Sequence, residues 1–104
     1  DGAGALAPAD VPRTSFDEEP ALVSTARSAL QRGDVGACMR AADEYRARFG
    51  AGTFAQEIEV IRIEGLLRAG EHTKARTAAE QFLAANAGSP YADRVRSLID
   101  RTAR

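Results

Sequence analysis

Residues 33–55, "GDVGACMRAADEYRARFGAGTFA", decide the fold, because their pattern returns at residues 70–92 as "GEHTKARTAAEQFLAANAGSPYA". Moving the chain over itself by 37 residues places glycine on glycine, alanine on alanine and one bulky side chain on another. The aligned pairs are Val23 with Val60, Leu30 with Leu67, Gly33 with Gly70, Asp34 with Glu71, Ala41 with Ala78, Ala42 with Ala79, Tyr45 with Phe82, Phe54 with Tyr91, Ala55 with Ala92, Ile58 with Val95 and Ile61 with Leu98. An internal repeat of this length predicts stacked helix hairpins.

The start of the first copy allows a second interpretation. Arg32-Gly33-Asp34 spells a short adhesion tripeptide, and Cys38 is the one thiol of the chain. The alignment favours structural roles instead, since the second copy has no arginine at this point and has Ala75 in the place of Cys38. We expect Gly33 to adopt the left-handed conformation that ends a helix and Asp34 to cap the next helix. Cys38 is then an inert small side chain on an apolar stripe.

Apolar spacing and turn residues predict five helices. Pro20 suits the first turn of a helix that runs from about Glu19 to Arg32. In the second helix, spacings of three and four residues join the apolar positions Val35, Cys38, Ala42, Tyr45 and Phe49. Gly50 ends this helix.

The third helix begins with a capping box of Thr53 and Gln56 and ends at Gly70. Its apolar residues cover more than one face, so we expect it to lie at the centre, packed on both sides. These residues are Ile58, Val60, Ile61, Ile63, Leu66 and Leu67. A fourth helix covers about residues 73–86, and Ser89 caps a fifth helix whose first residue is Pro90.

Residues 1–18 contain Pro8 and Pro12 and few large apolar side chains, which predicts a flexible linker of Ala, Pro and Gly. The linker would precede a single helical domain at residues 19–104. The acidic cluster at residues 17–19 would then stand before a helix, where the helix dipole favours negative charge. The chain lacks a starting methionine, and we expect it to be part of a longer protein.

The composition argues against several functions. A formal net charge of -1 leaves no positive excess to hold nucleic acid or an anionic membrane. Since no apolar run approaches the roughly 20 residues that cross a bilayer, we expect no direct membrane insertion by this segment. One cysteine cannot form an internal disulfide, so cysteine usage does not fix the compartment.

Groups that could carry chemistry are few, and we expect no enzyme, no metal site and no cofactor. His72 is the only histidine, and it falls in the turn after Gly70, where we expect it to be solvated. The alternative is a small hydrolase that uses His72 and the acidic residues. No histidine and cysteine cluster has metal-ligand spacing, and Gly33 and Gly36 lack the strand and lysine of a phosphate-binding loop.

The two copies resemble tetratricopeptide repeats. More narrowly, they are similar to the lengthened variant of bacterial envelope proteins, in which a small turn precedes an "A…F…F" pattern and an N-S-P-Y-A-type loop opens the next hairpin. The resemblance covers residues 19–104 and implies an all-α fold of antiparallel helix-hairpin repeats. Two hairpins and a C-terminal capping helix would form a fragment of a right-handed α-solenoid. The chain departs from the family at Leu22 and Glu59, where the family has tryptophan, and at Ala42 and Ala79, where it has a bulky side chain.

Such repeats occur in Tol-associated periplasmic proteins and in outer-membrane assembly lipoproteins. The resemblance therefore implies a noncatalytic protein-binding or scaffold module in the periplasm or cell envelope. Two alternatives stay open. The chain could be the regulatory C-terminal tail of an anti-sigma-type single-pass membrane protein, or a self-association module that pairs through an exposed end of the stack.

In this family the first helix of each hairpin lines a concave groove. Positions that are equivalent under the 37-residue shift would form rows along the groove. One row is Val23, Val60 and Ser97; a second is Arg27, Glu64 and Arg101; a third begins with Gln31 and Arg68. We expect a peptide or a partner helix to lie across these rows.

Overall fold

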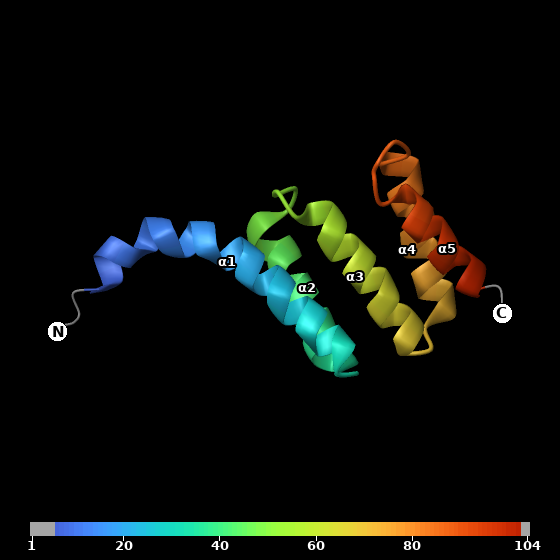
Figure 1. Ribbon diagram of the computed structural model, residues 1–104, viewed down its shortest axis with the longest axis horizontal. Coiled ribbons are helices and arrows are strands. Elements are labelled where there is room, and N and C mark those ends of the chain that lie inside the picture. The colour runs from blue at the N-terminus through green and yellow to red at the C-terminus, as the bar shows by residue number, and fades with distance from the viewer. Residues whose placement is uncertain (1–5, 103–104) are drawn as a thin grey trace.

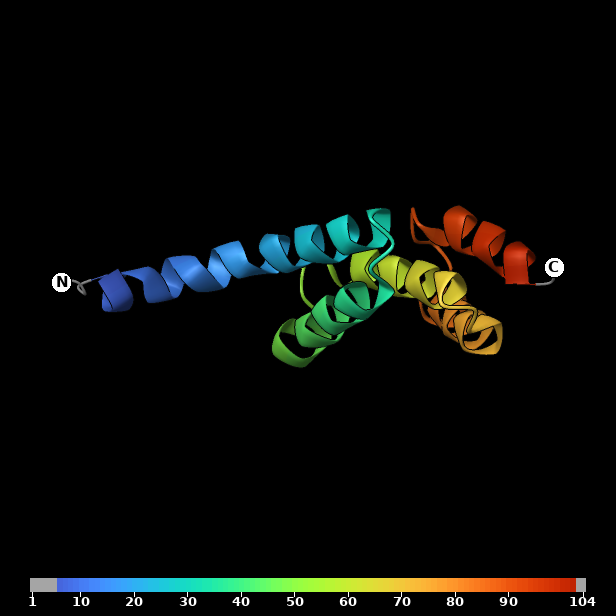
Figure 2. The ribbon, with the colours of Figure 1, turned by 90° about the horizontal axis from the view of Figure 1, so that it is seen from below.

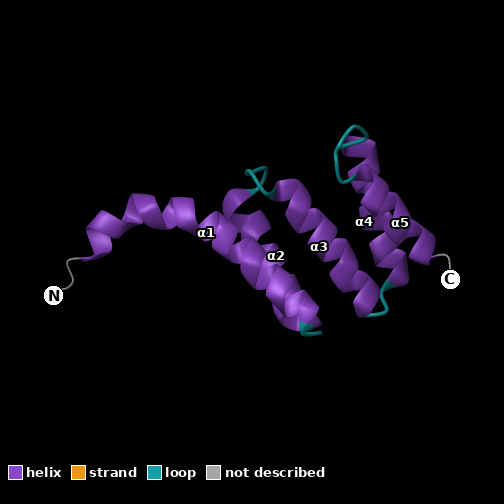
Figure 3. Cartoon of the chain, in the orientation of Figure 1, coloured by secondary structure: helices purple, strands orange, loops and turns teal. Residues whose placement is uncertain are grey.

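The computed structural model describes the backbone of residues 6–102 and the side chains of residues 18–102. Over these residues the chain is all-helical, and Figure 3 shows only helices and loops. The helices are α1 (Leu6–Gln31), α2 (Val35–Phe49), α3 (Ala55–Arg68), α4 (His72–Ala85) and α5 (Ala92–Thr102). The predicted all-α class is thereby confirmed.

The helices form two antiparallel hairpins and a final single helix. Each helix runs opposite to the one before it, so α1 pairs with α2 and α3 pairs with α4 (Figure 1). Seen from below, α1 and α5 lie on one side of α3, while α2 and α4 lie on the other side (Figure 2). Because α3 contacts all four other helices, its predicted central position is confirmed.

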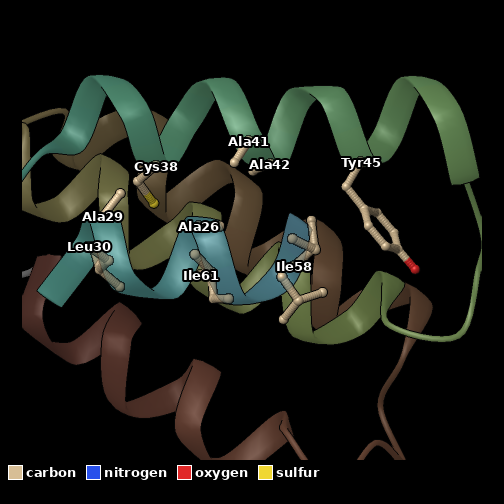
Figure 4. Close-up of a cluster of buried hydrophobic side chains, with 10 residues drawn as sticks. Ala26, Ala29, Leu30, Cys38, Ala41, Ala42, Tyr45, Ile58 and Ile61 are labelled. Atoms are coloured by element: carbon tan, nitrogen blue, oxygen red, sulfur yellow. The ribbon is translucent and has the colours of Figure 1, made fainter. Parts of the chain in front are cut away.

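The apolar side chains of α3 divide between two core clusters, which explains how one helix can be packed on both sides. Ile58 and Ile61 join the first cluster with residues of α1 and α2, whereas Val60 and Ile63 join the second with residues of α4 and α5. Figure 4 shows part of the first cluster: Ala26, Ala29, Leu30, Cys38, Ala41, Ala42, Tyr45, Ile58 and Ile61. The many alanines let the helices approach closely.

The turns of the repeat have the conformation that the sequence predicts. Gly33 and Gly70 both adopt a left-handed backbone, with φ of 81° and 80°, and Gly50 has φ of 50°. The side chain of Asp34 accepts a hydrogen bond of 3.0 Å from the backbone N–H of Ala37, as an N-cap should. The tripeptide at residues 32–34 therefore lies between α1 and α2, where Gly33 ends the first helix and Asp34 caps the second.

The first helix is longer than expected. Its first residue is Leu6 and not Glu19, and residues 1–5 lie outside the described part of the chain. The division into a flexible linker at residues 1–18 and a domain at residues 19–104 stays a prediction. Extending an existing helix needs no new nucleus, which explains how residues 6–18 can continue the helix despite Pro8 and Pro12. The acidic cluster at residues 17–19 accordingly lies inside α1 and not before it.

The three prolines of α1 affect its geometry in different ways. Pro8 lies in the first turn, where its missing N–H would have no partner in the helix. Pro12 and Pro20 lie further in, where each removes one backbone hydrogen bond. Figure 1 shows α1 bending along its length, as interior prolines cause.

Two predicted helix starts are corrected. The capping box of Thr53 and Gln56 does not form: α3 begins at Ala55 after Phe54, which makes no side-chain cap. The Thr53 N–H instead donates to the side chain of Glu19. The fifth helix begins two residues after the expected Pro90, at Ala92. Its predicted cap, Ser89, holds the preceding turn by accepting a 3.0 Å hydrogen bond from the N–H of Tyr91.

Candidate functional site

The surface that the sequence pointed to is an open trough with α3 as its floor. The helices α1 and α5 form its walls, and over the described residues they make no contact with each other (Figure 2). The trough has a volume of about 400 Å³. It is lined by Arg27, Leu30, Gln31, Glu57, Val60, Ile61, Glu64, Arg68, Tyr91 and Arg94.

Two further hollows adjoin the trough. The outer hollow, of about 260 Å³, lies along α1 and shares Arg27 and Gln31 with the trough. The loop-end hollow, of about 630 Å³, lies between the loop that precedes α3 and the loop that precedes α5, and it shares Tyr91 with the trough. Glu57 lines all three hollows, so they form one continuous open surface.

Two ion pairs bridge the floor of the trough to its walls. Arg27 of α1 pairs with Glu57 of α3, and Arg94 of α5 pairs with Glu64 of α3. Under the 37-residue shift, Arg27 aligns with Glu64 and Glu57 aligns with Arg94. The repeat therefore keeps the same contact in both copies but exchanges the charges of its two members.

The structure brings most of the predicted partner-binding residues together. Gln31, Arg27, Glu64 and Arg68 line the trough, as does Val60. Val23 lines the outer hollow. Val23 and Val60 are each only 5% exposed, however, so the predicted first row belongs mainly to the core. The apolar contacts that they make inside the stack leave little of them for a partner.

Ser97 and Arg101 line none of these three hollows, although both are exposed. The residues of α5 and its loop that face the trough are Tyr91 and Arg94. Under the 37-residue shift, Ser97 and Arg101 stand at the positions of Val60 and Glu64, by which α3 contacts the second cluster and α5. Over the described residues, α5 is the last helix, so no further helix meets these two positions. For these two positions the predicted rows do not continue into the trough.

Sequence reasoning did not single out Glu57, Tyr91 and Arg94 as site residues. A signal for the charged pair was present, since the shift that aligns Arg27 with Glu64 also aligns Glu57 with Arg94. The shift alone does not show which of these charges meet; the packing of α1 and α5 on α3 brings each pair together. Tyr91 was recognised only as a core residue, and it is in fact half-buried between core and trough.

A polar network holds the loop that forms the edge of the loop-end hollow. The Tyr45 hydroxyl donates to Glu19 Oε1 over 2.8 Å and accepts the N–H of Phe54 over 2.8 Å. In Figure 4 this hydroxyl points toward the loop that joins α2 and α3. Burial raises the pKa of the Tyr45 phenol, and the hydrogen bond to Glu19 raises it further. A Cβ atom on Gly52 would come within 2.8 Å of both polar side-chain oxygens, so the loop needs glycine there.

Cys38 is packed at the crossing of α2 and α3, as the alignment with Ala75 predicts. It is 0% exposed, and a Cβ atom on Gly65 of α3 would lie 3.5 Å from its sulfur. Burial raises the pKa of the Cys38 thiol; the charge of Glu64 also raises it, while Arg68 lowers it. The thiol therefore stays protonated at neutral pH and behaves as a small apolar group.

His72 is exposed, as expected, but it is the first residue of α4 and not part of the turn. Among the described residues, no group of three or more His, Cys, Asp or Glu side chains is arranged to hold a metal ion. Within residues 6–102, none of the helices combines the length and the apolar character needed to span a membrane. No family model, curated protein or solved structure matches this chain.

Proposed function

We propose that this chain is a noncatalytic protein-interaction module that binds a peptide segment in the trough over α3. The observation that carries the proposal is the continuous open surface made by the trough and its two adjoining hollows. The 14 residues of α3 give this surface a length of about 21 Å. An extended chain of about six residues has the same length.

The chemistry of the floor favours an extended peptide over a helix. An amphipathic helix binds by laying its apolar face into an apolar groove. Here the apolar floor residues Val60 and Ile61 are only 5% and 3% exposed, and five charged side chains line the same trough. An extended segment can instead use its backbone N–H and C=O groups to hydrogen-bond with these polar side chains.

The same proposal treats the two hairpins as tetratricopeptide-like units. Its support is the equivalence of the two copies: left-handed Gly33 and Gly70, and fully buried Cys38 and Ala75, occupy matching places. In such units the first helices form the binding face, which here means α1, α3 and α5. Location in the periplasm or cell envelope remains a prediction of the resemblance.

A random peptide library displayed on phage tests the proposal. Peptides selected on the wild-type chain should bind Glu57→Arg with a changed affinity, because Glu57 lines every part of the surface. Gln31→Trp, which fills the trough with an exposed indole, should abolish binding without disturbing an ion pair. The matched control is Glu80→Arg on α4, an equally large charge change at an exposed residue away from the trough.

Circular dichroism of each variant establishes that it is folded. Selected peptides that bind the wild type, Gln31→Trp and Glu80→Arg equally would place their site elsewhere and overturn the proposal. A library that yields no binding peptide at all would overturn it as well.

A further inference from the structure

The charges that line the trough do not balance. Three guanidinium groups, of Arg27, Arg68 and Arg94, face two carboxylates, of Glu57 and Glu64. Each carboxylate is already engaged, Glu57 by Arg27 and Glu64 by Arg94. The trough thus keeps one positive charge, which belongs to Arg68.

Arg68 has unused hydrogen-bonding capacity. It is exposed at the end of α3, and its guanidinium donates one hydrogen bond, to the backbone carbonyl of Leu30. Within the part of the chain whose side chains are described, no carboxylate lies within 4.0 Å of it. A guanidinium has five N–H donors in a planar fork that matches a carboxylate. The bond to Leu30 also fixes where this fork lies.

We infer that the peptide bound in the trough carries an aspartate or glutamate side chain that pairs with Arg68. This inference rests on the proposed function and adds the chemical class of the partner, an acidic extended peptide. A basic peptide would meet Arg68 unpaired and would have to displace Arg27 or Arg94 from its carboxylate. Like charges placed together in this way oppose binding.

The opposite end of the trough selects a different side chain. Glu57 and Tyr91 lie there, next to Phe54 and Phe82 of the loop-end hollow. An aliphatic or aromatic side chain of the peptide fits against the half-buried rings of Phe54 and Tyr91. Along α3, residues 57 and 68 are separated by about 16 Å, which corresponds to about five residues of an extended chain. The partner motif is therefore an acidic residue about five positions from an apolar one.

The experiment starts from a peptide selected on the wild-type chain, synthesised with an acetylated N-terminus and an amidated C-terminus so that only side chains carry charge. Fluorescence anisotropy measures its affinity and that of its counterpart with Asp or Glu replaced by Asn or Gln. Both peptides are titrated into the wild type, Arg68→Gln and Arg40→Gln. Arg40, an exposed arginine on α2, is the matched control because it lines none of the three hollows.

We expect Arg68→Gln to weaken the acidic peptide about tenfold, as the loss of a charge-assisted hydrogen bond does, and Arg40→Gln to leave it unchanged. The amide counterpart should bind the wild type about tenfold more weakly and lose nothing further on Arg68→Gln. Equal losses on Arg68→Gln and Arg40→Gln would overturn the inference. Selected peptides that bind in the trough but contain no acidic residue would also overturn it while leaving the proposed function intact.

Discussion

At the residue scale, the hydroxyl group of Tyr45 distinguishes the first copy of the repeat from the second. The aligned residue, Phe82, occupies the same buried place without a hydroxyl. In the first copy, Tyr45 and Glu19 together hold the loop at the N–H groups of Thr53 and Phe54. In the second copy, the side chain of Gln56 reaches the following loop by accepting a hydrogen bond from the Ser89 hydroxyl. Each hairpin thus fastens its next loop with different chemistry.

Replacing Tyr45 by phenylalanine should cost about 1–3 kcal/mol of unfolding free energy, because the Phe54 N–H and the Glu19 carboxylate lose a part-buried partner. Urea denaturation followed by circular dichroism measures this change. Tyr91→Phe is the matched control, since the Tyr91 hydroxyl makes no hydrogen bond among the described residues; it should change stability by less than about 0.5 kcal/mol. Equal effects of the two substitutions would show that the hydrogen bonds of Tyr45 do not contribute to the free energy of unfolding.

At the scale of elements, α3 is the member on which the rest of the stack depends. It separates the two core clusters, and its carboxylates at Glu57 and Glu64 hold one wall of the trough each. The side chain of Glu57 is 21% exposed and that of Arg27 is 46% exposed, so water screens their attraction in part. We therefore expect the two ion pairs to fix where α1 and α5 lie against α3, and to contribute little to the free energy of unfolding of the domain.

Exchanging the first pair tests this contact. Arg27→Glu alone places two carboxylates together and should lower the unfolding free energy by about 1 kcal/mol. The double variant Arg27→Glu with Glu57→Arg gives the first pair the charge order that Glu64 and Arg94 already have, and most of the loss should return. Urea denaturation at low salt and at about 1 M NaCl measures both effects, which salt should reduce. A double variant no more stable than Arg27→Glu would contradict the pairing.

At the scale of the whole molecule, α1 and α5 carry small or polar side chains at positions where α3 carries residues that pack inside the stack. On α5, exposed Ser97 and Asp100 stand at the positions of Val60 and Ile63, which pack on the next unit. On α1, exposed small side chains stand at the positions of Ile58, Ile61 and Gly65; these are Ala21, Ser24 and Ser28. Terminal units of a repeat stack need such outer faces to stay soluble. Pairing of two copies through these faces stays a prediction, which sedimentation tests.

We expect the wild-type chain to sediment as a monomer. The double variant Ser97→Val with Asp100→Ile should self-associate, because it gives α5 the apolar row that α3 buries. Analytical ultracentrifugation measures both. The matched control places the same two side chains on an exposed face of α4, as Arg76→Val with Glu80→Ile, and should associate less. A wild-type dimer, or equal association of both variants, would contradict the expectation that the exposed faces of α1 and α5 prevent self-association.

What the amino-acid sequence determined by itself is local or periodic. Gly33 and Gly70 end helices because only glycine adopts their backbone angles at low cost, and that requirement is visible in one residue. The helical spacing and the 37-residue repeat likewise predicted five helices, a central α3 and most of the core. The sequence pattern placed the start of α1 at Glu19, because Pro20 suits the first turn of a helix. In the structure, residues 6–18 continue the helix that the later residues form, and such an extension needs no nucleus of its own.

Only the tertiary structure decided which polar side chains meet. Arg27 and Glu57 are 30 residues apart, as are Glu64 and Arg94, and no local spacing rule links them. Because α3 is apolar on two sides, the sequence pattern did not settle which of its remaining sides is open. The packing of α1 and α5 on α3 leaves that side uncovered and places Arg68 there. The site therefore depends on how the helices stack, whereas the helices themselves depend on their own residues.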